Sequence, residues 1–447
     1  MTEKAARRAR RILSATWTLA LLMALPLLLG LGAPPANAAN SPAIRLLTTI
    51  PIKGTAANPK NQMFSFDISF VDPANGLYYL ADRSNAALDV IDTTGAFTGT
   101  PDSLYGQIGG GAFGFQGDTG SSGTSGPNGV ASAFPCIFAG DGNSRVISIN
   151  ASVSFVQPVS AVSTGGKFRA DELAYDPADG LLLVTNNAET VPFSTLLTVN
   201  KSTCALSNPI KITFNAANGV NATNGAEQSV WDPGTQRFYI SIPEIGGPGG
   251  GGPNGGVARI TTAGAIETVY PINYCQPAGL TLGPNGDLLV GCNTVFDTSG
   301  NACSAVAPAP ASNAKPATCT GTANPLAAVC NPVRGCTGNA LVAIPGAGGG
   351  DEVWFNRGDG NYYVTAGNNP LGPSVGVVGS NTSAQVNKLI QLIPTLPPVP
   401  AVTGVHNSGT VHSIAASATN NHIYIPLPAN TAYPNCSQGC IAVYGAQ

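Results

Sequence analysis

Short apolar segments alternate with tight polar turns along most of this chain, in one recurring phrase. The phrase is a polar residue, an apolar segment, a turn, a second apolar segment and a closing polar cluster. Clear copies are Asp67–Asp82, Asp171–Asn186 and Glu227–Ile242, and fainter copies begin at Ala278, Asp351 and His412. Apolar segments of this length between turn residues predict β-strands. No stretch after residue 40 has a sustained helical periodicity, so strands build the fold.

Asp-Pro pairs open three of the turns inside the repeated phrase. They are formed by Asp72, Asp176 and Asp232, each followed by a proline. Proline presets the backbone for a turn, and the aspartate side chain accepts hydrogen bonds from nearby amides. We therefore interpret these three aspartates as structural and exclude them from the candidate catalytic residues.

Weaker strand patterns follow each phrase, which indicates about four strands per copy. Candidates for the third strand are Ala87–Asp92, Leu196–Asn200, Gly256–Ile260 and Ala340–Ile344, and Ile266–Tyr270 is a candidate fourth strand. Repeats of this length with four strands each predict the blades of a β-propeller.

A degenerate copy of the phrase starts near Asn128, in the long gap between the first two clear copies. With it the repeat predicts an all-β, seven-bladed β-propeller, and six blades remain the alternative. The ring closes if Ile44–Ile50 supplies the outer strand of the blade begun at His412, beside Cys440–Tyr444. Such closure removes exposed sheet edges.

The composition suits one large β domain rather than several. The chain has 447 residues, of which 43% are hydrophobic, and it contains 55 glycines and 36 prolines. Charged residues make up only 10%, against about 25% in average soluble domains. Because the repeats run through the chain, we expect a single propeller domain over residues 39–447.

Residues 1–38 have the order of a secretory signal peptide. Basic residues precede an apolar run, Trp17–Leu31, and Ala36–Ala38 forms a small-residue cleavage site. An uncleaved anchor is the alternative, and Arg10-Arg11 weakly resembles a twin-arginine signal. We expect a secreted or periplasmic protein that has no membrane segment after cleavage.

The net charge argues against nucleic acid as a partner. Residues 1–38 carry five basic residues and one acidic residue, so cleavage takes the formal net charge from −3 to about −7. No basic patch remains after cleavage, which also argues against anionic membrane surfaces.

Ten cysteines follow residue 38, an even number that predicts disulfides in an exported chain. Cys436 and Cys440 are expected to close a small loop, and the pairs Cys275–Cys292 and Cys136–Cys204 are plausible. No Cys-x-x-Cys occurs, which argues against zinc. An insertion at about 297–339 is expected to be stapled by the remaining cysteines, which are Cys303, Cys319, Cys330 and Cys336.

Several segments resemble the NHL and lactonase-like (YVTN-type) β-propeller superfamily over about residues 42–447. The resemblance rests on the Gly-Pro-Asn-Gly turns at 126–129 and 283–286, on Tyr79–Asn85 and on Val90–Asp92. It implies the propeller fold. It does not specify a function, because the superfamily includes lactonases, lyases and binding scaffolds.

In a propeller the first residues of the innermost strands meet at one end of the central channel, which we call the channel mouth. Aligning the copies assigns to it Asp67, Asn128, Asp171, Glu227, Ala278, Asp351 and His412. The ends of the second strands add Asp82, Arg83, Asn85, Asp141, Asn186, Asn187, Glu244, Asn293, Asn368 and Asn369. Carboxylate and amide oxygens of this kind suit Ca²⁺ or another divalent cation.

The resemblance to gluconolactonase-type propellers implies which of these residues would be the metal ligands. Such enzymes hold a divalent ion at the channel mouth that polarises a lactone carbonyl. By position in the blade, the ligands here would be Asp171, Glu227, Asn187 and Asn293. Those enzymes commonly have six blades, whereas seven are predicted here.

A second cluster, Asp351, His412 and Asp67, comes from three adjacent blades. A histidine between two carboxylates has a raised pKa and could act as a general acid or base. Alternatively, it is an ion pair that holds the last blade against the first. His406 and His422 fall in loop or turn positions and are expected to be solvated.

These patterns predict an exported binding or scaffold protein with an acidic, calcium-compatible channel mouth. A small molecule or a protein would bind at that mouth, and the protein would be a monomer. The alternative is a divalent-metal-dependent hydrolase of the lactonase type. No Gly-x-Ser-x-Gly nucleophile elbow is found. The sequence leaves open whether the protein is an enzyme.

Overall fold

A computed structural model describes most of the chain after residue 42. The described ranges are 43–110, 113–153, 157–247, 254–296, 325–337, 341–347, 350–367, 373–395 and 411–446. Several predicted features lie outside them, namely the signal peptide at 1–38, Cys303, Cys319, Asn368, Asn369 and His406.

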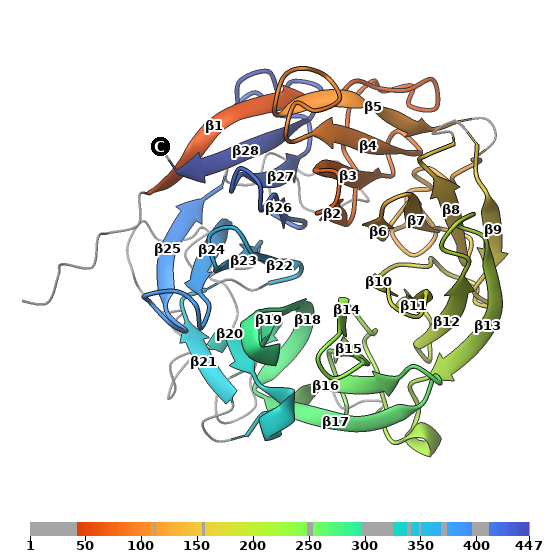
Figure 1. Ribbon diagram of the computed structural model, residues 1–447, viewed down its shortest axis with the longest axis vertical. Helices are drawn as coiled ribbons and strands as arrows, with labels where there is room; N and C mark the ends of the chain where they lie inside the picture. Colours follow the sequence, from red (N-terminus) through yellow and green to blue (C-terminus); the bar gives the residue numbers. More distant parts are fainter. Residues whose placement is uncertain are drawn as a thin grey trace, which may run out of the picture. The chain divides into compact units, whose positions relative to one another are not determined.

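Apart from three short 3₁₀ helices, the regular elements of the described residues are strands. The helices are η1 (Ala216–Asn218), η2 (Pro284–Gly286) and η3 (Pro332–Arg334). Most strands form four-stranded antiparallel sheets in which the strands follow each other outward in chain order. Figure 1 shows these sheets arranged in a ring, with the first strand of each nearest the centre.

The first three sheets contain twelve consecutive strands. One consists of β2 (Ser69–Val71), β3 (Leu77–Asp82), β4 (Ala87–Asp92) and β5 (Ser103–Gly109). The next has β6 (Val130–Ala133), β7 (Cys136–Asp141), β8 (Arg145–Asn150) and β9 (Ser160–Ser163). The third has β10 (Leu173–Asp176), β11 (Leu181–Asn186), β12 (Phe193–Val199) and β13 (Leu206–Thr213). The second of these sheets is the degenerate copy predicted near Asn128.

Two further groups of four strands are joined in one eight-stranded sheet. The first group is β14 (Ser229–Asp232), β15 (Arg237–Ile242), β16 (Asn254–Thr261) and β17 (Ile266–Asn273). The second is β18 (Cys275–Leu282), β19 (Leu288–Val295), β20 (Pro325–Cys330) and β21 (Leu341–Pro345). One parallel bridge, Asn254 to Cys275, links them. The predicted count of seven blades depends on dividing this sheet in two.

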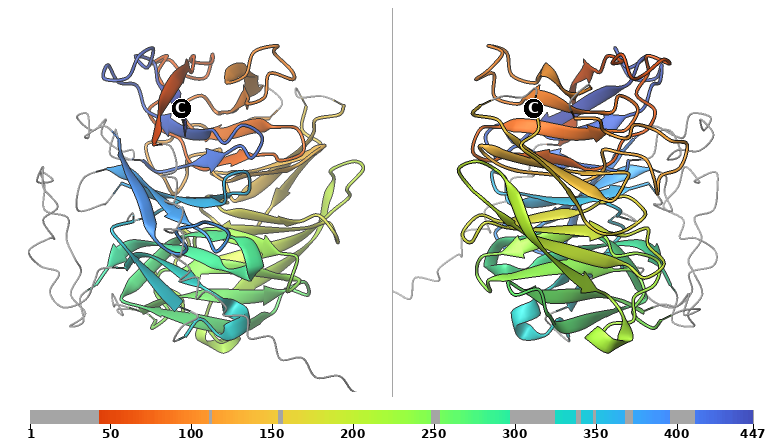
Figure 2. Two further views of the ribbon diagram at one scale, coloured as in Figure 1. Left: turned by 60° about the vertical axis from the view of Figure 1, so that its left-hand side comes forward. Right: turned by 90° about the vertical axis from the view of Figure 1, so that its right-hand side faces the viewer.

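The ring is completed by β22–β25 and by a sheet built from both ends of the described chain. The first comprises β22 (Val353–Asn356), β23 (Asn361–Ala366), β24 (Ser374–Gly379) and β25 (Leu389–Pro394). The second comprises β26 (Ala415–Ala416), β27 (Ile423–Leu427), β28 (Cys440–Ala446) and β1 (Ile44–Pro51). Strand β1 pairs antiparallel with β28, which confirms the predicted closure, and Figure 2 shows the two strands side by side.

One strand assignment from the sequence is wrong. The segment Ala340–Ile344 was expected to be a third strand, but β21 pairs with β20 and is therefore the fourth. The third strand, β20, lies inside the span 297–339 that was expected to be an insertion. Its short alanine-containing sequence has little apolar contrast with its surroundings, so the pattern did not mark it as a strand.

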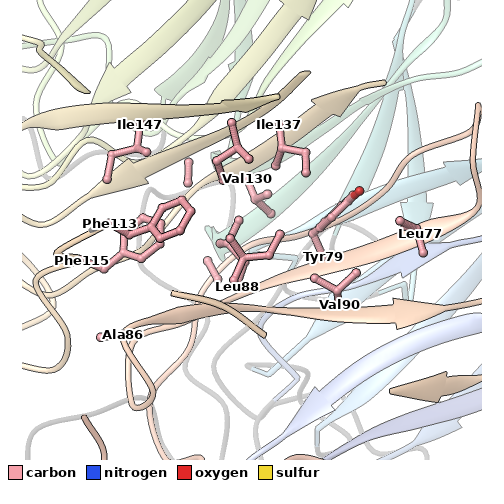
Figure 3. Close-up of a cluster of buried hydrophobic side chains, with 14 residues drawn as sticks. Leu77, Tyr79, Ala86, Leu88, Val90, Phe113, Phe115, Val130, Ile137 and Ile147 are labelled. Atoms are coloured by element: carbon pink, nitrogen blue, oxygen red, sulfur yellow. The ribbon is translucent and has the colours of Figure 1, made fainter. Parts of the chain in front are cut away.

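The core lies between neighbouring blades, because each sheet is covered on both faces. Alternate residues of β3 point to opposite neighbours. Leu77 and Tyr79 pack in a cluster that includes Val130 and Ile137 of the next blade, as Figure 3 shows. Tyr78 and Leu80 instead join a cluster with Tyr424, Ile441 and Val443 of the closing blade. This two-sided burial explains why second strands such as β3 are apolar at most positions.

The Asp-Pro turns have the structural role expected of them. Asp72 accepts a hydrogen bond from the Ala74 amide at 2.8 Å. It also accepts bonds from the Ser132 hydroxyl at 2.5 Å and the Phe134 amide at 2.9 Å in the neighbouring blade. Asp176 and Asp232 accept equivalent bonds within their own turns.

Four disulfides are present in the described residues. They are Cys136–Cys204, Cys275–Cys292, Cys330–Cys336 and Cys436–Cys440. The three pairings proposed from the sequence are confirmed. Disulfides of this number indicate an oxidising environment outside the cytoplasm. In the described part of the chain, no helix has the length and apolar character needed to cross a membrane.

Candidate functional site

The same backbone contact holds three of the acidic residues of the channel mouth in equivalent places. Each amide N–H donates to a carbonyl near the end of the second strand, at 2.7 to 2.9 Å; the pairs are Asp67 to Ala81, Asp171 to Thr185 and Glu227 to Ser241. The next residue along accepts the return bond in each case. The repeat therefore presents side chains at one level of the ring, and only their chemistry differs.

Asp67, His412 and Asp351 are in contact, as their predicted cluster required. The Nε2 atom of His412 lies 2.6 Å from Oδ1 of Asp67, and its Nδ1 atom lies 2.7 Å from Oδ2 of Asp351. Both ring nitrogens are therefore engaged by carboxylates. The three residues precede β2, β26 and β22, so the contact joins three blades.

A buried arginine completes this cluster. The Arg83 side chain is 1% exposed; it forms an ion pair with Asp67 and donates from Nε to Asn128 Oδ1 at 2.7 Å. Burial opposes ionisation of Asp67, but Arg83 and His412 hold its pKa well below the usual range. Burial also disfavours the imidazolium, yet Asp351 and Asp67 outweigh it and raise the pKa of His412 to about 10.

At neutral pH His412 is accordingly an imidazolium with both N–H groups donated to carboxylates. A general base must be able to take up a proton near the working pH. A histidine with this pKa and these contacts matches the alternative interpretation, an ion pair that ties the closing blade to its neighbours.

Two other acids of the channel mouth, Asp171 and Glu227, are less fully compensated by positive charge. Asp171 is buried and pairs with Arg169 at 2.7 Å. Its other oxygen, Oδ1, has no hydrogen-bond partner among the described residues. Burial and the nearby Asp67 raise the pKa of Asp171 to about 7, although Arg169 opposes the shift.

Glu227 is the second under-compensated carboxylate. Asn187 Nδ2 donates to its Oε2 atom at 3.2 Å, while Asn187 Oδ1 is buried without a partner in the described chain. Burial, Asp351 and Asp171 raise the pKa of Glu227 to about 8 against the effect of Arg169. Two carboxyl groups at this mouth therefore titrate near neutral pH.

A cavity of about 130 Å³ opens beside Glu227. It is lined by Asn224, Glu227, Pro243, Gln276, Pro277, Ala278, Asn293 and Thr294. These residues come from the segments before β14 and after β15 and from β18 and β19. The cavity thus brings together two of the predicted metal ligands, Glu227 and Asn293, with Ala278 of the channel mouth.

The structure adds a pair of acidic residues that the sequence interpretation missed. Glu172 and Glu352 are each 4% exposed and lie within hydrogen-bonding contact of each other. Burial and mutual proximity raise the pKa of Glu172 well above its ordinary value, and burial does the same for Glu352. The repeated Asp-Glu step at 171–172 and 351–352 is the signal that could have found them.

Several other predicted mouth residues form separate structural networks. Asp82 accepts from Asn85 at 2.5 Å within its own blade, and Asp141 pairs with Arg145 at 2.7 Å. Asn186 donates to the Ser144 hydroxyl and to two carbonyls. Glu244 accepts from Thr223 and Gln276. These side chains form hydrogen bonds and ion pairs with nearby strands and loops.

His422 lies in the turn before β27, as expected, but it is paired rather than simply solvated. Its Nδ1 atom lies 2.8 Å from Asp102 Oδ2, and the same carboxylate accepts from the Tyr424 hydroxyl at 2.5 Å. Asp102 precedes β5, so this contact fixes the same blade seam as His412. Partners this distant in sequence cannot be recognised from the local pattern.

The predicted divalent site remains a prediction. The oxygens of Asp171, Glu227, Asn187 and Asn293 are of the type that Ca²⁺ prefers. However, the described residues contain no group of three His, Cys, Asp or Glu side chains arranged to hold a metal ion. Any ion would rely on amide oxygens and water for most of its ligands.

Comparisons with known proteins bear on the fold. No protein-family model matches the chain, and no curated protein matches it in sequence. Among solved structures, it is similar to Kuenenia stuttgartiensis hydrazine synthase, with a TM-score of 0.56, 11% identity and coverage of 86% of this chain and 99% of that chain. A chain of the mitotic checkpoint complex matches with a TM-score of 0.52, 9% identity and coverage of 96% and 98%. At these identities the likeness shows the fold alone, and that fold is a β-propeller.

Proposed function

We propose that this protein is an exported binding scaffold whose acidic channel mouth takes up a cationic ligand. The observation that carries the proposal is an imbalance of charge. Six acids gather here, and among the described residues the positive partners that act on them are Arg83, Arg169 and His412; the acids are Asp67, Asp171, Glu172, Glu227, Asp351 and Glu352. A cleft lined by one sign of charge attracts and concentrates the opposite sign.

A double variant that neutralises the uncompensated side tests this function. We expect a fluorescently labelled tetralysine peptide to bind the purified protein at low salt and to lose about tenfold in affinity in Asp171→Asn/Glu227→Gln. The matched control, Asp179→Asn/Glu267→Gln, removes the same charge at exposed positions. Fluorescence polarisation in which wild type fails to bind, or both variants bind alike, would reject the proposal.

A second candidate is a divalent-metal-dependent hydrolase of the lactonase type. It is favoured by the grouping of Asp171, Glu227 and Asn187 and by the cavity that Glu227 shares with Asn293. Metal analysis of the purified protein, paired with a lactone-hydrolysis panel, tests it. Loss of bound metal in Glu227→Ala would support the metal site. Unchanged metal content in that variant would reject it.

The family, location and partners belong to the same proposal. Membership of the NHL and lactonase-like superfamily is supported by the Gly-Pro-Asn-Gly turns and the fold class. Export is supported by the four disulfides and by the order of residues in 1–38. We propose a secreted or periplasmic monomer that binds a small molecule or a protein, with Ca²⁺ or another divalent cation as a possible cofactor.

A further inference from the structure

The chain crosses from the closing blade to the first blade, β2–β5, through residues 52–66, which we call the strap. Backbone hydrogen bonds of 2.7 to 3.0 Å tie both ends of the strap to the closing blade; the pairs are Ile52 to Gly439 and Met63 to Gln438. Its middle is tied to the first blade, because Asn85 Oδ1 accepts from the Thr55 amide at 3.0 Å and from Asn58 Nδ2 at 2.9 Å. The strap therefore bridges the junction where the ring closes.

Two fully buried aspartates lie next to the strap on one face of the first blade. Asp82 ends β3 and Asp89 lies in β4. Leu80 is the cross-strand partner of Asp89, and side chains two residues apart on a strand share a face, so Asp82 and Asp89 point to the same side. Leu80 packs with Tyr424 and Val443, so this side faces the closing blade. The two carboxyl groups are within hydrogen-bonding contact of each other.

Each aspartate shares its amide partner with the strap. Asn85 Nδ2 donates to Asp82 Oδ2 at 2.5 Å and to the Lys53 carbonyl at 3.3 Å. Gln107 Nε2 donates to Asp89 Oδ1 at 2.7 Å and to the same carbonyl at 3.0 Å. One carbonyl of the strap therefore accepts from the two amides that hold the carboxyl groups.

This pair of carboxyl groups keeps a proton for lack of a positive partner. In the described chain, no positively charged side chain is among the influences that shift either group, and Asp89 Oδ2 has no hydrogen-bond partner there. Two buried carboxyl groups in contact do not both ionise readily. Burial and Asp82 raise the pKa of Asp89 well above its ordinary value, and burial raises the pKa of Asp82 to about 6. Neither residue belongs to the metal ligands proposed for the channel mouth.

Other ionisable groups packed around the pair are neutral or directed elsewhere. Burial raises the pKa of Tyr78 and that of Tyr424 on the closing blade, so both hydroxyl groups stay protonated. On the strap, Lys53 and Lys60 are exposed to solvent. Arg83, which follows β3, forms an ion pair at the channel mouth. Titration at this place is therefore that of the two aspartates.

We propose that Asp82 and Asp89 form a proton-dependent latch for the strap. While they share a proton, their two amide partners also hold the Lys53 carbonyl. When the proton is lost, two buried negative charges repel each other and draw in water, and the middle of the strap detaches. The loop at 83–86 carries Arg83 to the channel mouth, so release of the strap also loosens the loop that positions this arginine. This inference goes beyond the proposed function and does not depend on it.

The latch weakens as the pH rises. In the folded protein both pKa values are raised, so the closed pair keeps protons that the open, hydrated pair loses. The stabilising contribution is complete below the ordinary aspartate pKa of 3.8 and is lost as the pH rises through the raised values. Within that interval, opening becomes easier by up to about tenfold per pH unit for each proton released.

Hydrogen exchange measured by mass spectrometry on residues 54–61 tests the latch. Exchange is expressed as protection factors, which remove the intrinsic pH dependence of the chemistry. In the wild type we expect protection to fall by at least about tenfold between about pH 5 and about pH 8. Asp89→Asn puts a permanent donor beside Asp82, so its protection should not change with pH. The matched control, Asp179→Asn, removes an exposed carboxylate and should behave as the wild type does.

Three outcomes would overturn the latch. One is wild-type protection that stays constant with pH, and another is a fall with pH that persists in Asp89→Asn. The third is protection that is lost on dialysis against a chelator rather than on raising the pH, which would mean that the pair holds a cation instead of a proton. If circular dichroism shows that Asp89→Asn is not folded, Asp82→Asn carries the same prediction, with its amide donating to Asp89.

Discussion

Two groups of acids at the channel mouth use the same position of the repeat to opposite effect. On the seam side, Asp67 is paired with Arg83 and His412, and its pKa is held well below the usual range. In the second group, Asp171, although paired with Arg169, and Glu227 have pKa values raised to about 7 and 8. The backbone presents all three in the same way, so the difference arises from the neighbouring side chains.

The contrast distinguishes carboxylates that stabilise the fold from carboxylates that could bind a ligand. Fully paired carboxylates stabilise the junction where the ring closes. Because they already have positive partners, a cationic ligand would gain little free energy by binding there. Asp171 and Glu227, whose pKa values stay raised although Arg169 lies nearby, could still be stabilised by a bound cation. Perturbed acids in a concave site are candidates for function, although structural ion pairs also shift pKa values.

The largest expected effect comes from breaking the compensated side. Arg83→Met leaves Asp67 buried without its guanidinium partner, and removing one member of a buried ion pair costs about 3–5 kcal/mol. We expect a loss of that size in the free energy of unfolding, measured by urea denaturation. Arg237→Met, which removes an exposed ion pair with Glu267, should have little effect. Equal losses in the two variants would show that the seam is not specially stabilised.

The pH dependence of stability sharpens the role of His412. Its folded pKa of about 10 lies above its ordinary value, so its contribution is complete below about pH 6.5 and is lost as the pH rises through 10. Between pH 7 and 9 the wild type should lose stability by about 1.4 kcal/mol per pH unit relative to His412→Gln. Parallel stability curves for the two proteins would contradict the ion-pair assignment.

Where buried carboxylates face each other, replacing one of them by an amide should stabilise the folded protein. Folded pKa values of Glu172 and Glu352 are raised, so their unfavourable contribution appears above the ordinary glutamate pKa and grows with pH. Glu172→Gln removes one of the two carboxyls and should raise the unfolding free energy by about 1–2 kcal/mol at pH 8, and less at pH 5. Urea unfolding at both pH values tests this, with Glu267→Gln as the control. A destabilised variant at pH 8 would contradict the assignment of this pair as an unfavourable contact.

The smallest expected effect concerns Asp351, which acts on both His412 and Glu227. Asp351 is 33% exposed, contacts His412 and raises the pKa of Glu227. Asp351→Asn should therefore lower the pKa of both His412 and Glu227, each by about one unit. Carbon and nitrogen NMR titration of the two side chains measures the shifts. A pKa change at His412 alone would show that Asp351 does not influence the pKa of Glu227.

Much of the fold was predictable because its signals are local. Strand pairs, Asp-Pro turns and the first residue of each copy are set by alternation and turn chemistry within about sixteen residues, as in Asp67–Asp82. Strand β20 was missed because it follows a long low-complexity segment and has weak apolar contrast. His422 was misjudged because its partner, Asp102, lies in another blade.

The sequence by itself indicated the repeating strands, the closure of the ring by β1 and β28, one small disulfide loop with two further plausible pairings, and the blade-starting residues of the channel mouth. Only the tertiary structure decided which of the acidic residues are paired with a positively charged side chain. Arg83 and Arg169 reach particular carboxylates, and Glu172 meets Glu352 from a distant blade. Charge at a buried site depends on the distance to every neighbouring charge and on the loss of water, and both are properties of the assembled ring.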